Sequence, residues 1–200
     1  GADQRKENPH VCVSNDRIHW KPFEGEGKAV SLDPLTPFED PDKQYNSDTH
    51  LVYRKDIDTL ECYWRQVDNR TRIDKIMKRT TTDGIHWSKA QNVLVSDART
   101  DRILSPAIIY ENGRYKMWTV NCKRKFPVLY RESKDGFHWT TPSTIQLKYP
   151  SDRLRSWHLD VIHTEKGYEM IVVAFYKGHR HREMNLYYTS SKNEHDFKKC

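Results

Sequence analysis

A seven-residue motif recurs along the chain and constrains the fold more than any other feature of the sequence. Its clearest copy is Ser133-Lys134-Asp135-Gly136-Phe137-His138-Trp139. In each copy a hydroxyl residue is followed two positions later by Asp or Asn, and six positions later by Trp or Phe; the other copies begin at Ser14, Thr81 and Ser191. Successive anchor aromatics are 67, 52 and 58 residues apart. Such spacing, with loops of variable length, is typical of a fold built from repeated units.

The chemistry of the motif predicts a hairpin. Asp-Gly between two apolar runs favours a two-residue turn, because both central positions of that turn need a positive φ. The hydroxyl and carboxylate side chains can accept hydrogen bonds from nearby backbone N–H groups and hold the turn. Each tryptophan stands at a fixed distance from its turn, so we predict that Trp20, Trp87 and Trp139 are buried hairpin anchors and not ligand platforms.

Short apolar strands and turns fill the rest of the chain. Residues 10–14 and 18–22 predict one hairpin, and the proline-rich residues 23–46 predict a long loop. Three units of four strands follow, expected at 50–53, 60–67, 73–80 and 85–90; at 107–110, 114–121, 127–132 and 137–141; and at 159–163, 168–176, 185–190 and 196–199. No stretch shows an amphipathic helical pattern. Repeated four-stranded antiparallel units are the blades of a β-propeller.

The predicted fold is therefore all-β, a β-propeller of four-stranded antiparallel blades with three complete blades and part of another. We treat residues 1–200 as a single propeller domain, with blade units at about 10–22 (partial), 47–92, 104–147 and 156–199. Because propellers close with about 4–8 blades, the domain is expected to be incomplete. The remaining blades are expected from a longer chain, with a second chain as the alternative.

Composition limits the classes of partner. The net charge is +6, but the basic residues are dispersed apart from one run at 177–182, which we interpret as a loop between strands. A solvated basic surface is therefore favoured over a nucleic-acid groove, while a polyanionic ligand stays open. No apolar run reaches 18 residues, so no membrane span is predicted. The compartment stays open, and we favour a secreted or surface-associated protein over a cytoplasmic one.

The cysteines give no sign of a metal or redox centre. None of them has Cys-x-x-Cys spacing, so neither a zinc site nor a thioredoxin-type centre is predicted, and their disulfide state stays open; they are Cys12, Cys62, Cys122 and Cys200. No cofactor is predicted.

The order of three motifs resembles a known superfamily. Ser105-Pro106 opens a predicted inner strand, Tyr115-Lys116-Met117-Trp118 follows, and the Ser133–Trp139 motif comes next. This order is similar to that in the five-bladed propellers of the glycoside hydrolase superfamily, which includes arabinanases, xylosidases, invertases and mannoside phosphorylases. The resemblance covers roughly residues 10–199. It implies a carbohydrate ligand at the mouth of a central funnel, with catalytic carboxylates at the starts of the inner strands.

The resemblance directs attention to two columns of residues. Aligning the three predicted inner strands puts Asp48, Ser105 and His158 in one column, and His50, Ala107 and Asp160 two residues later; both columns share a face if side chains alternate. We hypothesise that Asp48, as general base, and Asp160 are the catalytic carboxylates, because inverting glycosidases use two carboxylates about 6.5–9.5 Å apart. The predicted substrate-binding residues are His50, His158, Arg102, Arg155 and Trp157.

The sequence thus favours a glycosidase-like, carbohydrate-active propeller that binds or cleaves a glycan at its central funnel. The superfamily usually supplies its general acid as a Glu at the start of a later inner strand, and no predicted inner strand begins with Glu. This departure keeps a non-catalytic glycan-binding or receptor-binding module of a larger protein as the alternative. A scaffold for protein partners is a third hypothesis, and no feature of the sequence supports it. No metal ligand is assigned, although His50 and His158 could coordinate an ion on the axis. The sugar and its linkage stay open.

Overall fold

The computed structural model describes residues 7–22, 35–36, 40, 42–123, 125–178 and 183–197. These residues form strands and turns, and no helix occurs among them. The first sheet contains β3 (Gln44–Arg54), β4 (Thr59–Asp68), β5 (Ile73–Thr81) and β6 (Gln91–Asp97). The second contains β7 (Ile103–Glu111), β8 (Arg114–Asn121), β9 (Val128–Ser133) and β10 (Ser143–Thr144). The third contains β12 (Leu154–Thr164), β13 (Gly167–Tyr176) and β14 (Met184–Ser191).

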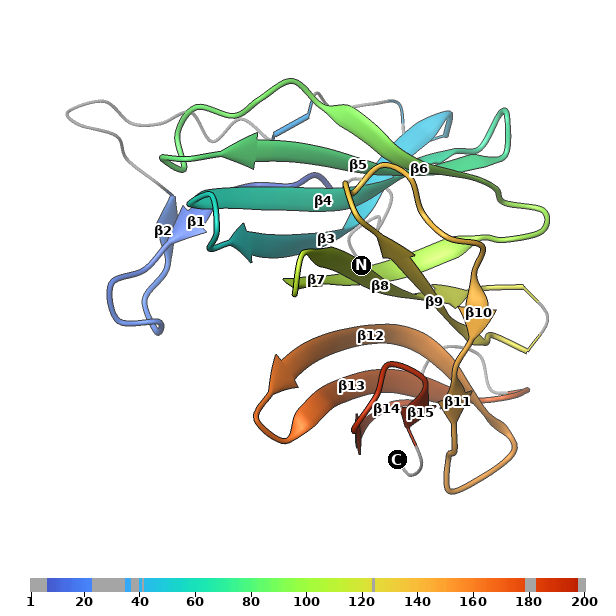
Figure 1. Cartoon of the computed structure of the whole chain (residues 1–200). Coiled ribbons are helices and arrows are strands. Elements are labelled where there is room, and N and C mark those ends of the chain that lie inside the picture. Colours follow the sequence, from blue (N-terminus) through green and yellow to red (C-terminus); the bar gives the residue numbers. More distant parts are fainter. Residues whose placement is uncertain are drawn as a thin grey trace.

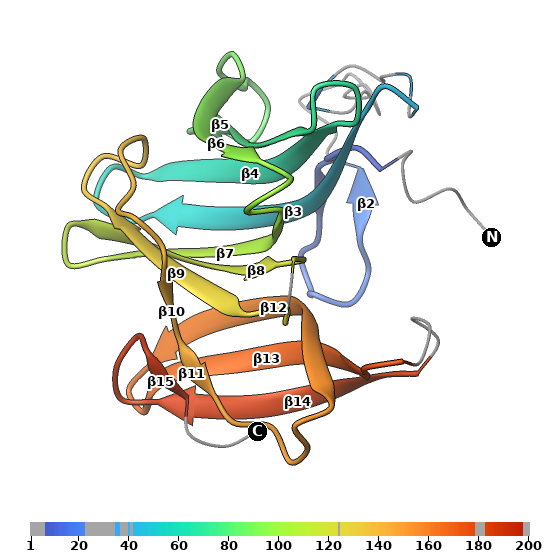
Figure 2. The same cartoon turned by 90° about the vertical axis from the view of Figure 1, so that its right-hand side faces the viewer.

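The three sheets lie one above another, as blades of a propeller do (Figure 1). Within each sheet, neighbours in the chain pair antiparallel, so every sheet is a meander. The innermost strands are β3, β7 and β12, and β7 contacts both of the others. Figure 2 shows the same stack from the side. The all-β, antiparallel prediction is confirmed, and the fold is that of a partial β-propeller.

Two short pairs of strands complete the architecture. Near the N-terminal end, β1 (Cys12–Val13) and β2 (Lys21–Pro22) form the predicted hairpin. At the other end, β15 (Asp196–Phe197) pairs in parallel with β11 (Gln146–Leu147), and the third sheet is therefore three-stranded among the described residues. The expected strand 196–199 extends beyond the described residues, as does most of the basic run at 177–182.

The repeated motif is a closed loop and not the two-residue turn that we expected. Only the residue after the aspartate has a positive φ: Gly136 at 76°, Gly84 at 75° and Arg17 at 64°. In the clearest copy, Asp135 Oδ1 accepts hydrogen bonds from the N–H groups of Phe137 and His138, both at 2.8 Å. The loop satisfies its own backbone, so the outer strand starts only after it. Accordingly β6 begins at Gln91 and β10 at Ser143, later than the expected strands at 85–90 and 137–141.

The anchor aromatics differ in burial, and the prediction is wrong for Trp20. Its side chain is 62% exposed, because the β1–β2 hairpin pairs only with itself. Trp87 and Trp139 are half-buried and each packs against an apolar cluster. Phe197, the anchor of the most altered copy, is fully buried between the second and third sheets.

The core lies between the sheets, and the second sheet is buried on both faces. One face packs on the first sheet through Ile108 and Met117, and the other packs on the third sheet through Trp118 and Val120. Burial on both faces explains why six consecutive residues are buried in each of β7 and β8. This packing fixes the three inner strands relative to one another.

The third sheet leaves an apolar face uncovered by the described residues. Ile162, Ile171, Leu186 and Tyr188 are 51–73% exposed, and Ile171 and Tyr188 are paired in register across β13 and β14. The expectation that further blades, from a longer chain or a second chain, complete the ring stays a prediction.

Candidate functional site

Each inner strand carries a β-bulge at the same level. The pairing register shifts between Ser47 and His50 in β3, between Leu104 and Ala107 in β7, and between Ser156 and His158 in β12. A bulge turns a side chain out of the regular ladder and is frequent next to active sites. Pro106 is compatible with β7 because a bulge needs no ladder N–H at that position. Asp48 and Ser105 have φ values of 55° and 50°, a region that residues other than glycine rarely adopt.

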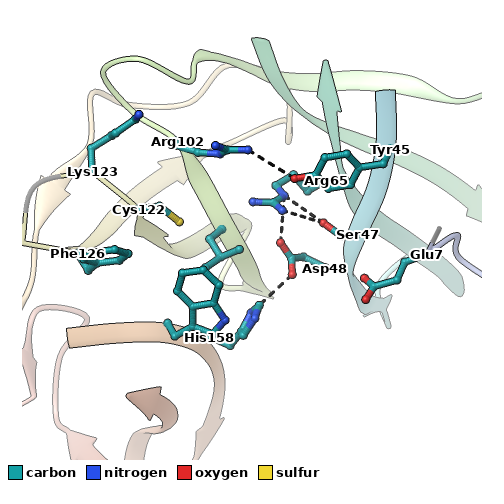
Figure 3. A pocket seen from close by; sticks show the side chains of 12 residues that line it. Glu7, Tyr45, Ser47, Asp48, Arg65, Arg102, Cys122, Lys123, Phe126 and His158 are labelled. Carbon is teal, nitrogen blue, oxygen red and sulfur yellow. Dashed lines mark hydrogen bonds and ion pairs between the residues drawn. The ribbon is translucent and has the colours of Figure 1, made fainter. Parts of the chain in front are cut away.

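The three bulges bring one predicted column of residues together. The Ser105 Oγ contacts His158 Nδ1, and the Ser105 N–H donates to Asp48 Oδ2 at 3.4 Å. The His158 Nδ1 lies 3.6 Å from Asp48 Oδ1. Figure 3 shows Asp48 between His158 and a buried arginine, Arg65. Residues from three different sheets thus meet at one point.

Arg65, on β4, holds the Asp48 carboxylate in place. Its Nε lies 3.1 Å from Asp48 Oδ2, and its Nε and Nη2 donate to the Ser47 Oγ at 3.1 and 3.0 Å. Its Nη1 donates to the backbone carbonyl of Ile103 at 2.9 Å. The Asp48 side chain is 9% exposed, and a buried ion pair of this kind needs such additional hydrogen bonds to be stable. Asp48 Oδ2 is therefore engaged, and Oδ1 is directed towards His158.

These groups line a cavity of about 480 Å³. Its lining residues come from all three sheets and from the N-terminal segment; they are Glu7, Tyr45, Ser47, Asp48, Arg65, Arg102, Leu104, Cys122, Lys123, Phe126, Trp157 and His158. In Figure 3, Glu7 lies on one side of Asp48, while Arg102 and Lys123 lie on the opposite side of the cavity. The volume matches a ligand-binding cleft that would hold a sugar residue.

Burial changes the acid–base properties of three lining groups. Burial lowers the pKa of His158 and outweighs the opposing effect of Asp48, so the imidazole is neutral at pH 7. Burial, together with the negative charge of Asp48, raises the pKa of Glu7. Burial raises the pKa of the Cys122 thiol to about 11, which makes it unreactive at neutral pH. The cavity therefore combines a carboxylate, a neutral imidazole and a carboxyl group that keeps its proton more readily than usual.

The structure brings four of the seven predicted site residues to this cavity: Asp48, His158, Arg102 and Trp157. His50 instead contacts the backbone of Ile108, with its Nε2 2.7 Å from the carbonyl oxygen and 3.0 Å from the nitrogen. The Asp160 side chain is 66% exposed, and its Oδ1 lies 3.7 Å from His50 Nδ1. Arg155 lines a neighbouring cavity. The catalytic role of Asp160 stays a prediction without a shared cavity to support it.

Arg65 and Glu7 are among the lining residues that the sequence analysis does not assign to the site, for different reasons. Arg65 is a lone cation in the apolar run 60–67, and a charge there could have been identified as a buried functional group. Tyr45 precedes the strand expected at 50–53, but as an aromatic near the predicted funnel it is expected to suit stacking on a sugar, and it lines the cavity. Glu7 lies in a polar N-terminal segment that shows no pattern.

Glu7, Asp48 and His158 have the side-chain chemistry of metal ligands. The described residues nevertheless contain no group of three or more His, Cys, Asp or Glu side chains placed to hold a metal ion. Within the same residues, no helix is long and apolar enough to cross a membrane.

A buried carboxylate, that of Asp74, lies next to Arg102. Asp74 is fully buried, neither of its oxygens has a hydrogen-bond partner among the described residues, and its Oδ2 lies 3.9 Å from Arg102 Nε. Burial raises the pKa of Asp74, and the charges of Arg65 and Arg102 only partly oppose it. The charged form of Asp74 is therefore destabilised by folding.

We expect Asp74→Asn to raise the free energy of unfolding at pH 7 by about 1–2 kcal/mol. The folded state binds the Asp74 proton more tightly than the unfolded state, so the stability of the wild type falls as the pH rises between the two pKa values. Asparagine has no such proton, and its advantage should vanish below about pH 4. Urea unfolding at both pH values measures the difference. A less stable variant at pH 7 would mean that Asp74 and Arg102 form a net favourable pair.

The chain is similar to known proteins that act on carbohydrates. No protein-family model matches the sequence. The chain is 25% identical over 231 residues to the A type blood N-acetyl-alpha-D-galactosamine deacetylase of Flavonifractor plautii, an alignment that covers 94% of this chain and 29% of that protein. The chain therefore spans less than a third of this curated relative.

Solved structures of carbohydrate-acting enzymes are also similar to this chain. A crystal structure of an N-acetylgalactosamine deacetylase from F. plautii, in complex with blood group B trisaccharide, has a TM-score of 0.78 at 24% identity and covers 95% of this chain and 59% of that chain. An exo-1,5-alpha-L-arabinanase from a bovine ruminal metagenomic library has a TM-score of 0.61 at 15% identity, with 91% and 64% coverage. The alpha-L-arabinanase of Penicillium chrysogenum has a TM-score of 0.56 at 14% identity, with 93% and 56% coverage. The chain has the fold of the propeller glycoside hydrolases.

Proposed function

We propose that this chain carries the active site of an enzyme that hydrolyses the acetamide group of an N-acetylated sugar. The observation that carries the proposal is Asp48, held by Arg65 with its second oxygen directed towards the neutral His158, in a cavity that would hold a sugar residue. The alignment with a protein named as an N-acetylgalactosamine deacetylase extends over 94% of the chain and includes all three inner strands. The alignments with arabinanases support only the fold.

Amide hydrolysis needs a base for water and an acid for the departing nitrogen. Asp48 suits the base: a water beside its Oδ1 gives up a proton to the carboxylate while the water oxygen adds to the acetyl carbon. The C–N bond then breaks as the nitrogen takes up a proton, and the products are acetate and a free amino sugar. Glu7 suits the donor of that proton, because burial and the charge of Asp48 raise its pKa.

The remaining lining residues suit binding and charge stabilisation. Arg102 and Lys123 place positive charge across the cavity from Glu7, where the acetyl oxygen becomes negative as water adds. The rings of Phe126 and Trp157, with centroids 6.2 Å apart, form an apolar wall for the face of a sugar ring. His158 lies beside Asp48 Oδ1, the Ser105 N–H donates to Asp48 Oδ2, and together they orient the carboxylate.

Glycosidic cleavage is the second candidate, and one observation favours it. Glu7 and Asp48 line the same cavity, and a pair of carboxyl groups in one site is what glycoside hydrolases use. Glu7 would be the general acid and Asp48 the base or nucleophile. The predicted partner Asp160 is not among the residues that line this cavity.

The reaction products distinguish amide hydrolysis from glycosidic cleavage. The chain is incubated with a panel of N-acetylated oligosaccharides; acetate and free amine are measured by NMR, and glycan length by mass spectrometry. We expect equal amounts of acetate and amine with no change in length. New reducing ends without acetate would replace this proposal with a glycosidase. Binding that yields neither product would overturn both and favour a non-catalytic glycan-binding module.

A further inference from the structure

A second cavity, of about 430 Å³, adjoins the cavity that Asp48 lines. This second cavity lies between the second and third sheets. It is formed by the segment 125–128, the segment that contains and follows β11, and the first residues of β12. Phe126 lines both cavities, and Ser156 of the second cavity immediately precedes Trp157 of the first. A ligand long enough to pass Phe126 would therefore occupy both.

Positive charge dominates the lining of this second cavity. Lys125, Lys148 and Arg155 line it, against a single acid, Asp152. None of the three cations forms an ion pair with another described residue. The Arg155 Nη1 donates to the backbone carbonyls of Asp152 and Leu154 at 2.6 and 2.7 Å, which holds the guanidinium in place without neutralising its charge. A fixed and unpaired guanidinium is the group that recognises carboxylates and sulfates in a forked geometry.

Aromatic rings form the other part of the lining. Phe126 has a φ of 55°, a conformation that is unfavourable for a bulky residue and that occurs most often at functional sites. Its ring packs edge-on against Phe175 at a centroid distance of 5.3 Å. On another part of the wall, the Tyr149 hydroxyl and the Ser156 Oγ form a hydrogen bond of 2.9 Å. Rings beside cations match a sugar that has an apolar face and an anionic substituent.

We propose that this second cavity is a subsite for a sugar residue bearing a carboxylate or sulfate, so that the substrate is an acidic oligosaccharide spanning both cavities. The inference rests on the proposed function for the identity of the ligand as a glycan. It assigns Arg155 the principal contact with the anionic group, with Lys148 and Lys125 beside it. The net charge of +6 favours the approach of such a ligand.

Binding of matched oligosaccharides to the intact chain tests this. Three N-acetylated glycans of equal length are titrated by calorimetry: a neutral one, a sulfated one and one containing a uronate. We expect the acidic glycans to bind at least about tenfold more tightly than the neutral one at low salt, with a smaller difference at high salt. A preference for only one acidic glycan identifies the anionic group that the subsite accepts. Equal binding of all three would overturn the proposal.

Two variants locate the effect. Arg155→Gln should remove most of the preference for acidic glycans and affect the neutral glycan little. Arg153→Gln is the matched control, because it removes the same charge two residues away and does not line the cavity. Equal losses in both variants would show a general electrostatic attraction and overturn the subsite.

The test of the subsite can fail or succeed independently of the proposed reaction. Asp48→Asn should slow acetate release strongly and keep the preference for acidic glycans, since Asp48 does not line the second cavity. An Arg155-dependent preference in a protein that releases no acetate would overturn the enzymatic proposal alone. Acetate release without any such preference would overturn the subsite alone.

Discussion

Asp48→Asn is expected to lower the rate of acetate release by about a thousandfold. General acid–base catalysis typically contributes about 10²–10⁴-fold, and asparagine cannot take up the proton of an attacking water. The amide oxygen of asparagine can still accept a hydrogen bond from Arg65, so the side chain should keep its position. Steady-state kinetics on the best glycan of the panel measures the loss. An undiminished rate would remove Asp48 from catalysis.

The control for this variant must account for stability, because replacing Asp48 removes a charge that pairs with the buried Arg65. Ser47→Ala suits that purpose. It removes two hydrogen bonds from the same guanidinium and leaves the carboxylate of Asp48 in place. We expect both variants to melt a few degrees below the wild type, and only Asp48→Asn to lose turnover. Similar losses of activity in the two would indicate that the ordering of Arg65, and not the base, is what the reaction needs.

The first column of the predicted site could be read from the sequence because its members occupy equivalent places in the repeat. Once the inner strands were aligned, Asp48, Ser105 and His158 fell together, and the structure brings them into contact. Sequence repetition implies that structurally equivalent positions lie at the same level of the propeller.

The second column could not be read in the same way. We assumed that residues two apart in a strand share a face, but the bulge between Ser47 and His50 inserts an extra residue and breaks that alternation. Asp48 therefore lines the cavity while His50 packs against the backbone of Ile108. A bulge has no simple sequence signal, except where a proline such as Pro106 stands inside an apolar strand.

The repeated motif shows a related limit of sequence patterns. Its residues form a turn, as the sequence predicts, but the turn is of another type, because the motif also fits a loop in which only the residue after the aspartate needs a positive φ. The outer strands therefore begin several residues later than the sequence predicts. Burial of the anchor aromatics also varies, since each depends on which sheet lies opposite the hairpin and not on the motif.

Trp118 is a residue whose truncation should strongly destabilise the fold. It is fully buried between the second and third sheets, where its ring packs at 5.1 Å from Tyr130 and 5.7 Å from Tyr168, measured between ring centroids. Its Nε1 donates to the backbone carbonyl of Glu194 at 3.0 Å, which connects β8 to the closed loop before β15. One side chain thus contributes to the packing of two blades and to the fixation of the last motif.

We expect Trp118→Ala to lower the free energy of unfolding by about 3–5 kcal/mol, because it leaves a large cavity between the sheets and an unsatisfied carbonyl. The matched control is Trp20→Ala, which removes the same atoms from a side chain that is 62% exposed and should change stability by less than about 0.5 kcal/mol. Chemical denaturation followed by circular dichroism gives both values. Loss of the interface should also release β12, and with it His158, from the cavity. Activity should therefore fall together with stability in Trp118→Ala. In Trp20→Ala, neither activity nor stability should fall. Equal destabilisation by the two substitutions would contradict the stacking of the second and third sheets on which the candidate site depends.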